Sequence, residues 1–161
     1  MTFLRPAIAI GAILLAVGGC AGQSRAKKAD SPDLKEIRDY RLNMDILQKY
    51  IKAYKTVMAD PAAKKCAEYN SPGNARTLDE GEKLLNTCAP AVADLNAAGV
   101  KPREFLIVTA AVLGDFMAVS MKKAGTIKEY PSSISPENAA FLEQNWDKLQ
   151  VLVKPLMGDD K

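Results

Sequence analysis

The 161-residue sequence contains no histidine, and this absence excludes several classes of site. A serine or cysteine nucleophile cannot be activated by a histidine base. Histidine-ligated zinc, non-haem iron and c-type haem are excluded for the same reason. With three cysteines in the whole sequence, one copy of the chain cannot build a site from four thiolates either. We therefore expect no metal and no cofactor.

An excess of charge of either sign is also lacking. The sequence has 22 basic and 19 acidic residues, for a net charge of +3. Nucleic-acid binding requires a concentrated basic face that neutralises phosphates, so no nucleic-acid partner is expected. Hydrophobic residues make up 48% and charged residues 25%, which is the balance of a globular domain.

An apolar run near the N-terminus ends on a cysteine. Arg5 precedes the run "PAIAIGAILLAV", residues 6–17. The run has the length of a signal-peptide core and is shorter than the roughly 20 residues of a membrane-spanning helix. The tetrapeptide "VGGC", residues 17–20, resembles the lipobox of bacterial lipoproteins: an aliphatic residue, two small residues and a cysteine. This resemblance covers the first 22 residues, and the remainder resembles no characterised family.

The lipobox resemblance implies cleavage and lipid attachment. A signal peptide over residues 1–19 would be removed before Cys20, and lipids would be attached to the sulfur and the new amino group of Cys20. Several acyl chains anchor stably, because each buried CH₂ contributes about 0.8 kcal/mol. Ala21 follows, and the sorting rule of Gram-negative lipoproteins then implies the periplasmic face of the outer membrane. The alternatives are an uncleaved membrane anchor or a plain secretory signal with an incidental cysteine.

Polar residues separate the lipobox from the rest of the chain. Residues 20–32 are mostly small, polar or charged and have no apolar period. Such a composition predicts a flexible tether between the lipid and the folded domain. We therefore expect a signal peptide over 1–19, an acylated cysteine and tether over 20–32, and a helical domain over 33–161.

Two cysteines remain when Cys20 is set aside. Export to an oxidising compartment predicts a disulfide between Cys66 and Cys88. Closing a loop of this size stabilises the fold by roughly 3 kcal/mol through chain entropy. A redox-active pair is the functional alternative, although the CxxC spacing is missing. Two buried free thiols are the other alternative.

Caps and apolar residues at three- and four-residue spacing predict helices throughout the domain. Helix starts are marked at Ser31-Pro32, Asn43, Asp60-Pro61, the capping box "TLDE" at 77–80, Pro90, Pro102 and Ser135-Pro136. Helix ends are marked at Gly99, Gly125 and Pro155. No alternating run predicts a sheet. The expected fold is all-α, a compact bundle of five to six helices, and residues 32–59 can form one helix or two.

The longest apolar segment, residues 102–124, is predicted to be the buried central helix. Strand propensity competes locally in "FLIV", but the segment is too long for a strand and is rich in Ala, Leu and Met. Apolar residues around the whole helix predict burial on all sides. Gly114, Ala111 and Ala118 share one side with Ile107, which predicts close approach by a neighbouring helix. A cofactor slot along this side is the alternative.

Asp115 and Glu104 of this segment are the candidates for a ligand or ion-pair site. Asp115 lies at the edge of the buried side, near the azimuth of Glu104 and Val108. A buried carboxylate must be paired or have its pKa raised, so Asp115 is expected to bind a Lys or Arg side chain or a ligand. Eleven residues of helix separate the two backbones by roughly 16 Å, too far for the carboxylate pair of a glycosidase.

Three functions are compatible with these features. The leading hypothesis is a non-catalytic, lipid-anchored envelope protein that acts through protein–protein contacts or as an accessory subunit, because no catalytic constellation accompanies the anchor. The second is a binding module that holds a small apolar ligand within the bundle, which the methionines and the apolar central helix would suit. The third is an enzyme without histidine that uses Asp115, Glu104 or lysine and tyrosine groups.

Overall fold

The computed structural model describes residues 31–69 and 75–157, and within these ranges every regular element is an α-helix. The all-α class is confirmed, and the described part of the chain contains eight helices rather than five or six. Cys20 and the signal peptide lie outside the described residues, as does nearly all of the predicted tether. The helices are α1 (Pro32–Asp39), α2 (Met44–Ala59), α3 (Pro61–Tyr69), α4 (Leu78–Asn86), α5 (Ala89–Ala97), α6 (Pro102–Lys123), α7 (Pro136–Gln144) and α8 (Trp146–Met157).

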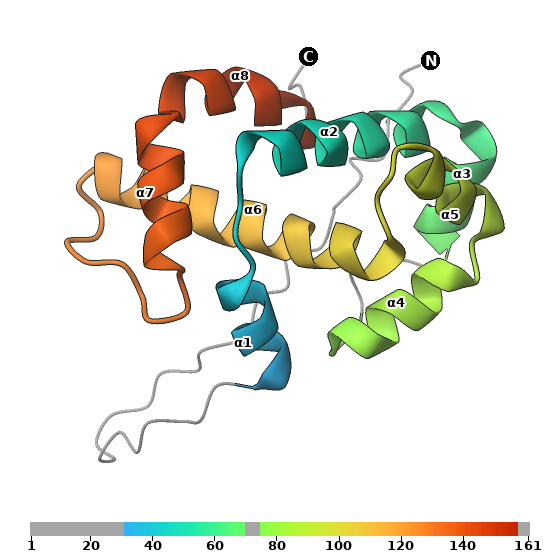
Figure 1. Cartoon of the computed structure of the whole chain (residues 1–161), viewed down its shortest axis with the longest axis horizontal. Helices are drawn as coiled ribbons and strands as arrows, with labels where there is room; N and C mark the ends of the chain where they lie inside the picture. Colours follow the sequence, from blue (N-terminus) through green and yellow to red (C-terminus); the bar gives the residue numbers. More distant parts are fainter. Residues whose placement is uncertain (1–30, 70–74, 158–161) are drawn as a thin grey trace, which may run out of the picture.

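Helix α6 is the centre of the bundle. In Figure 1 it runs through the middle of the view, with α2 and α8 above it, α1 and α4 below it and α7 crossing its C-terminal half. Pro102 occupies its first turn, where the missing backbone donor costs nothing. Gly125 lies just beyond its end with a φ of +72°, a conformation that glycine adopts without strain. The sequence prediction of a central helix here is confirmed.

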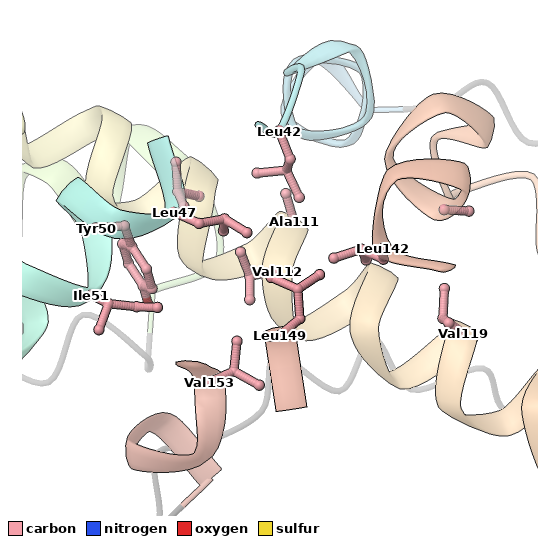
Figure 2. Close-up of a cluster of buried hydrophobic side chains, with 12 residues drawn as sticks. Leu42, Leu47, Tyr50, Ile51, Ala111, Val112, Val119, Leu142, Leu149 and Val153 are labelled. Carbon is pink, nitrogen blue, oxygen red and sulfur yellow. The ribbon is translucent and has the colours of Figure 1, made fainter. Parts of the chain in front are cut away.

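One hydrophobic cluster joins α6 to α2, α7 and α8. Figure 2 shows Ala111 and Val112 of α6 facing side chains from these three helices. At the edge of the cluster, the rings of Phe116 and Trp146 stack with their centroids 4.6 Å apart. The buried members of the cluster are Leu42, Leu47, Tyr50, Ile51, Val108, Ala111, Val112, Val119, Ala139, Leu142, Leu149 and Val153.

A second hydrophobic cluster lies between α2, α3, α4 and α5. The Cys66–Cys88 disulfide joins α3 to the residue before α5 in this cluster, with the two Cα atoms 5.7 Å apart. The predicted disulfide is thus present in the structure. Cys88 is buried and Cys66 is partly buried; the other buried members of the cluster are Ala53, Val57, Ala63, Leu85, Ala91, Leu95 and Val100.

The predicted caps form as expected. Asn43 Oδ1 accepts a hydrogen bond from the Ile46 amide at 2.9 Å, which begins α2. Residues 32–59 therefore form two helices, because the chain is extended at Asn43 and at Tyr40. Thr77 Oγ1 accepts from the Glu80 amide at 3.1 Å, and Glu80 reaches back to the Arg76 amide at 2.8 Å. Local hydrogen bonding of this kind can be recognised in sequence because it needs no distant partner.

The C-terminal helical segment differs from the prediction of one helix that stops at Pro155. It divides at Asn145, where the side-chain amide and the backbone amide both donate to the Phe141 carbonyl, at 2.9 and 3.1 Å. Asparagine competes with the helix for backbone partners in this way, which favours a break. Helix α8 then continues through Pro155 to Met157, so the predicted end was wrong. A proline near a helix end removes a single backbone donor there.

Helix α6 is not buried on all sides, which corrects a second expectation. Ala111 and Ala118 are buried, but apart from the two adjacent residues and the backbone of α6 itself, no atom lies within 4 Å of the place where a Cβ on Gly114 would stand. Among the described residues, no helix makes the predicted close approach at Gly114. By length and composition alone α6 could cross a membrane, a weak criterion that the core helix of a soluble protein also meets.

Candidate functional site

Glu104 lies in the first turn of α6 and is hydrogen-bonded to Tyr40, the residue that follows α1. The Tyr40 hydroxyl donates to Glu104 Oε1 at 2.8 Å. Burial of the phenol, together with this bond to a carboxylate, holds the pKa of Tyr40 well above its usual range. The Glu104 carboxylate therefore accepts a hydrogen bond from the segment between α1 and α2, and this contact explains its position without a ligand.

Asp115 lies in the middle of α6 and is 5% exposed. Its Oδ2 accepts a hydrogen bond from Asn138 Nδ2 at 3.0 Å. Desolvation raises the pKa of Asp115 to about 6, although the bonds from the Asn138 side chain and the Ser135 backbone favour the ionised form. No Lys or Arg within the described ranges forms an ion pair with Asp115, so the expected cationic partner is replaced by an amide.

Asn138 is the residue that organises this region, and the sequence analysis missed it. It is 1% exposed, in the first turn of α7. Its Nδ2 donates to the Tyr40 carbonyl at 2.9 Å as well as to Asp115, and its Oδ1 accepts from the Leu42 amide at 2.9 Å. Its place four residues before buried Leu142 was the available signal, since that spacing puts both on one side of a helix.

These contacts form a buried polar network, here called the Asn138 network, made of Asn138, Asp115, Ser135 and the backbone of Tyr40 and Leu42. Both N–H groups and the carbonyl oxygen of the Asn138 side chain form hydrogen bonds, as a buried amide requires. The network joins the middle of α6 to the first turn of α7 and to the segment between α1 and α2. The network therefore fixes the positions of these three segments relative to one another.

Ser135 connects this network to two exposed charged residues, Arg41 and Glu137. Its Oγ accepts from Arg41 at 3.2 Å and donates to Glu137 Oε2 at 3.2 Å. Arg41 and Glu137 also form an ion pair of 2.5 Å, with both side chains more than half exposed. The neighbouring guanidinium lowers the pKa of Glu137.

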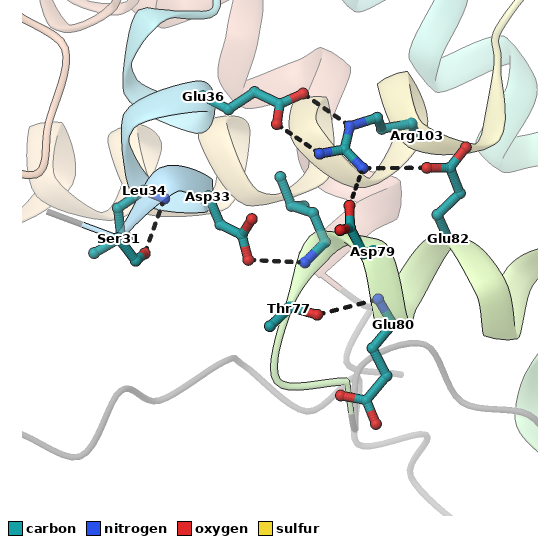
Figure 3. Close-up of polar contacts among 10 residues, drawn as sticks. Ser31, Asp33, Leu34, Glu36, Thr77, Asp79, Glu80, Glu82 and Arg103 are labelled. Atoms are coloured by element: carbon teal, nitrogen blue, oxygen red, sulfur yellow. Dashed lines mark hydrogen bonds and ion pairs between the residues drawn. The ribbon is translucent and has the colours of Figure 1, made fainter.

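A second polar cluster, here called the Arg103 cluster, joins α1 and α4 to α6 (Figure 3). The Arg103 guanidinium binds both oxygens of Glu36, at 2.9 and 2.7 Å. It also binds Asp79 at 2.6 Å and Glu82 at 3.2 Å. These carboxylates raise the pKa of Arg103, and the bond to Arg103 lowers the pKa of Glu36. One cation thus faces three carboxylates, for a net charge of −2 when all are ionised.

The structure does not bring the two predicted site residues together. Glu104 binds the Tyr40 hydroxyl, and Asp115 belongs to the Asn138 network, which reaches the Tyr40 carbonyl. Tyr40 therefore connects to both carboxylates through different atoms. This arrangement positions helices, and no hydrogen bond joins the two carboxylates to each other.

A small cavity lies beside Glu104, between α2 and the beginning of α6. Its volume is about 50 Å³, and Lys49, Tyr50 and Val108 help to line it. Ligand pockets in proteins are usually several hundred Å³, whereas a space of this size suits water. Within the described ranges, no group of three or more acidic or cysteine residues could hold a metal ion.

Comparisons with protein-family models, curated proteins and solved structures found no match to this chain.

Proposed function

We propose that this chain is a lipid-anchored, non-catalytic protein of the bacterial cell envelope that acts through contacts with other envelope components. The observation that carries the proposal is the order of Arg5, the apolar run over residues 6–17 and the "VGGC" lipobox. The presence of the Cys66–Cys88 disulfide supports export, because such bonds persist in oxidising compartments.

The contacts of the candidate residues support a structural role for the folded domain. Glu104 and Asp115 each hold a hydrogen bond between segments that are distant in the sequence. Both carboxylates are thus used in holding helices together. The alternative of an apolar-ligand carrier predicts a retained ligand, which native mass spectrometry of the purified protein would reveal.

Metabolic labelling with a palmitate analogue tests the anchor directly. We expect the full chain to incorporate the label, and its intact mass to correspond to a chain that begins at Cys20 with acyl groups attached. The Cys20→Ala variant loses the label, whereas the neighbouring Ala21→Ser variant keeps it. Labelling that persists in Cys20→Ala would overturn the proposed anchor.

Membrane fractionation tests the proposed location on the periplasmic face of the outer membrane. By the sorting rule that the lipobox resemblance brings with it, the acylated chain fractionates with the outer membrane. Ala21→Asp retains the lipid and moves to the inner membrane. An unchanged distribution of the Ala21→Asp variant contradicts the assignment of the membrane and leaves the anchor intact.

Crosslinking in intact cells tests the proposed role in contacts. The acylated chain is expected to yield the same crosslinked envelope partner in repeated preparations, and Cys20→Ala, which is released from the membrane, loses that product. Uniform crosslinking to abundant proteins, equal in the two variants, would count against a specific interaction.

A further inference from the structure

Helix α3 has few noncovalent contacts of its own. It is nine residues long, and isolated helices shorter than about 12–15 residues are marginal in water. Within residues 61–67, whose side chains the structure describes, Ala63 is the one that is fully buried, and Lys64 and Lys65 form no ion pair. Burial of an alanine removes little apolar area from water, so these side chains hold α3 weakly.

Two links fix the position of α3. At its beginning, Asp60 Oδ1 accepts a hydrogen bond from the Ala62 amide at 2.8 Å, which fixes the turn that follows α2. Further along, the Cys66–Cys88 disulfide joins α3 to the residue before α5. Helices α3 and α5 pack together at the end of the bundle opposite α7 (Figure 1). If the disulfide opens, the turn at Asp60 remains as the stronger of the two links.

The two cysteines of the disulfide differ in exposure. Cys88 is 0% exposed, whereas Cys66 is partly exposed at the edge of the second hydrophobic cluster. Thiol–disulfide exchange requires a thiolate to reach one sulfur of the disulfide, and access decides which sulfur is attacked. A reductant that arrives from solvent therefore reaches Cys66, and Cys88 becomes the leaving group.

We propose that the disulfide is a redox switch for α3, which a dithiol reductant opens by attack on Cys66. A thiolate of the reductant forms a mixed disulfide with the Cys66 sulfur, while the Cys88 sulfur leaves with the electron pair of the broken bond and takes a proton from water. The second thiol of the reductant then attacks its own sulfur in the mixed disulfide and releases Cys66 as a thiol. The reductant ends as a disulfide, and the two cysteines end as thiols.

Reduction releases α3 and leaves the rest of the bundle folded. None of the described members of the first hydrophobic cluster comes from α3, so this cluster keeps its packing around α6. The second hydrophobic cluster loses Ala63 and becomes accessible where α3 covered it. The switch goes beyond the proposed anchor and does not depend on it, because Cys20 takes no part in the exchange.

Hydrogen exchange measured by mass spectrometry tests the release of α3. The full chain carrying Cys20→Ala, in which Cys66 and Cys88 are the remaining cysteines, is compared in native buffer with and without the dithiol dithiothreitol. We expect the α3 amides to exchange at least about tenfold faster after reduction, while the α6 amides keep their protection. The emission of Trp146, the single tryptophan, reports on the first hydrophobic cluster and should not change. In the same chain, the added pair Cys66→Ala and Cys88→Ala should give fast exchange of α3 with or without dithiothreitol.

Several outcomes of this experiment would overturn the switch. Equal protection of the α3 amides before and after reduction would show that packing holds the helix. Loss of protection in α3 and α6 together would show that the bond maintains the whole fold. A disulfide that stays intact in dithiothreitol under native conditions would show that no dithiol reaches it.

Reaction with glutathione tests the point of attack. Glutathione has one thiol and leaves a mixed disulfide on the cysteine that it attacks, and N-ethylmaleimide then alkylates the released cysteine. We expect the product with glutathione on Cys66 and maleimide on Cys88 to exceed the reverse product by at least about tenfold. Equal amounts of the two products, or glutathione mainly on Cys88, would overturn the attack on Cys66.

Discussion

The Arg103 cluster and the Asn138 network both fasten the region around α1 to α6, and they use charge in opposite ways. The Arg103 cluster surrounds one partly exposed cation with three carboxylates. The Asn138 network buries one carboxylate and gives it an amide and a backbone N–H as partners. The pKa of Glu36 is lowered in the first, and the pKa of Asp115 is raised to about 6 in the second.

This difference indicates which of the two, the Arg103 cluster or the Asn138 network, contributes more to the stability of the fold. Exposed ion pairs contribute little, because water already solvates both charges well. A buried polar group costs much more when it loses its partner, because no water replaces that partner. The buried network should therefore contribute more to stability, although the exposed cluster contains more ion pairs.

The largest expected effect is that of Asn138→Ala. The substitution leaves the Leu42 amide, the Tyr40 carbonyl and Asp115 without the partner they now share. Because each buried group left unpaired costs about 1–3 kcal/mol, we expect the free energy of unfolding in urea to fall by about 4 kcal/mol. The exposed Asn96→Ala serves as the control and should change it by less than about 0.5 kcal/mol. If Asn138→Ala lowers the free energy of unfolding by less than about 1 kcal/mol, the buried network does not contribute more to stability than the Arg103 cluster.

Reduction of the disulfide measures the contribution of a covalent bond to stability, with which the contributions of the two polar clusters can be compared. Cys66 and Cys88 are 22 residues apart in sequence, and closing such a loop stabilises the fold by about 3 kcal/mol through chain entropy. Unfolding of the Cys20→Ala chain with and without reductant should differ by about this amount, since no residue changes between the two samples. Equal midpoints with and without reductant would contradict the expected contribution.

The Asp115→Asn substitution tests the cost of the buried charge. An aspartate whose pKa rises from 3.8 to about 6 on folding gives a fold that is most stable when the carboxyl is protonated. Stability loses this contribution as the pH rises from about 4 to about 6, and above that the full penalty, on the order of 3 kcal/mol, is present. The difference in unfolding free energy between Asp115→Asn and the wild type should therefore grow in favour of the variant over this range. If the difference in unfolding free energy between the variant and the wild type is the same at pH 4 and pH 7, burial does not raise the pKa of Asp115.

The smallest expected effect is that of Arg103→Gln, about 1 kcal/mol, because the pairs of this cluster reach the solvent. The loss should largely disappear in 1 M NaCl, where the screening length falls to about 3 Å, whereas the cost of Asn138→Ala should persist. Exposed Arg76→Gln is the matched control for removing one positive charge. If Arg103→Gln costs more than Asn138→Ala, the order proposed here is reversed.

Local features of the fold were predictable from the sequence. The caps at Asn43 and Thr77 and the start of α6 at Pro102 depend on residues a few positions away. The disulfide was predictable for a different reason, because Cys66 and Cys88 are the two cysteines left once Cys20 is assigned to the anchor. The all-α class follows from the apolar spacing, which is likewise a local property.

Features that depend on distant contacts were not predictable. Asn138 is 98 residues from Tyr40 in sequence, and nothing around either residue indicates that the side-chain amide of one meets the carbonyl of the other. Asp115 was correctly singled out as a carboxylate near the buried side of its helix, but its partner could not be chosen among the polar residues of the chain. Gly114 was expected under a neighbouring helix and is open instead, because apolar periodicity does not reveal how many helices cover α6.

Helix α1 is the first described element of the chain, and it contains no buried residue. Partly buried Ile37 packs against the first hydrophobic cluster, and polar contacts also hold this region to the bundle: Glu36 to Arg103, Asp33 to the Leu78 amide, and Tyr40, just after the helix, to Glu104. Mechanical tension applied to the chain before Ser31 would load these contacts first, while the Cys66–Cys88 bond and the two hydrophobic clusters lie further along the chain. Helix α1 would then detach under force before the core, lengthening the extended chain that precedes α2 while α2 to α8 remain folded.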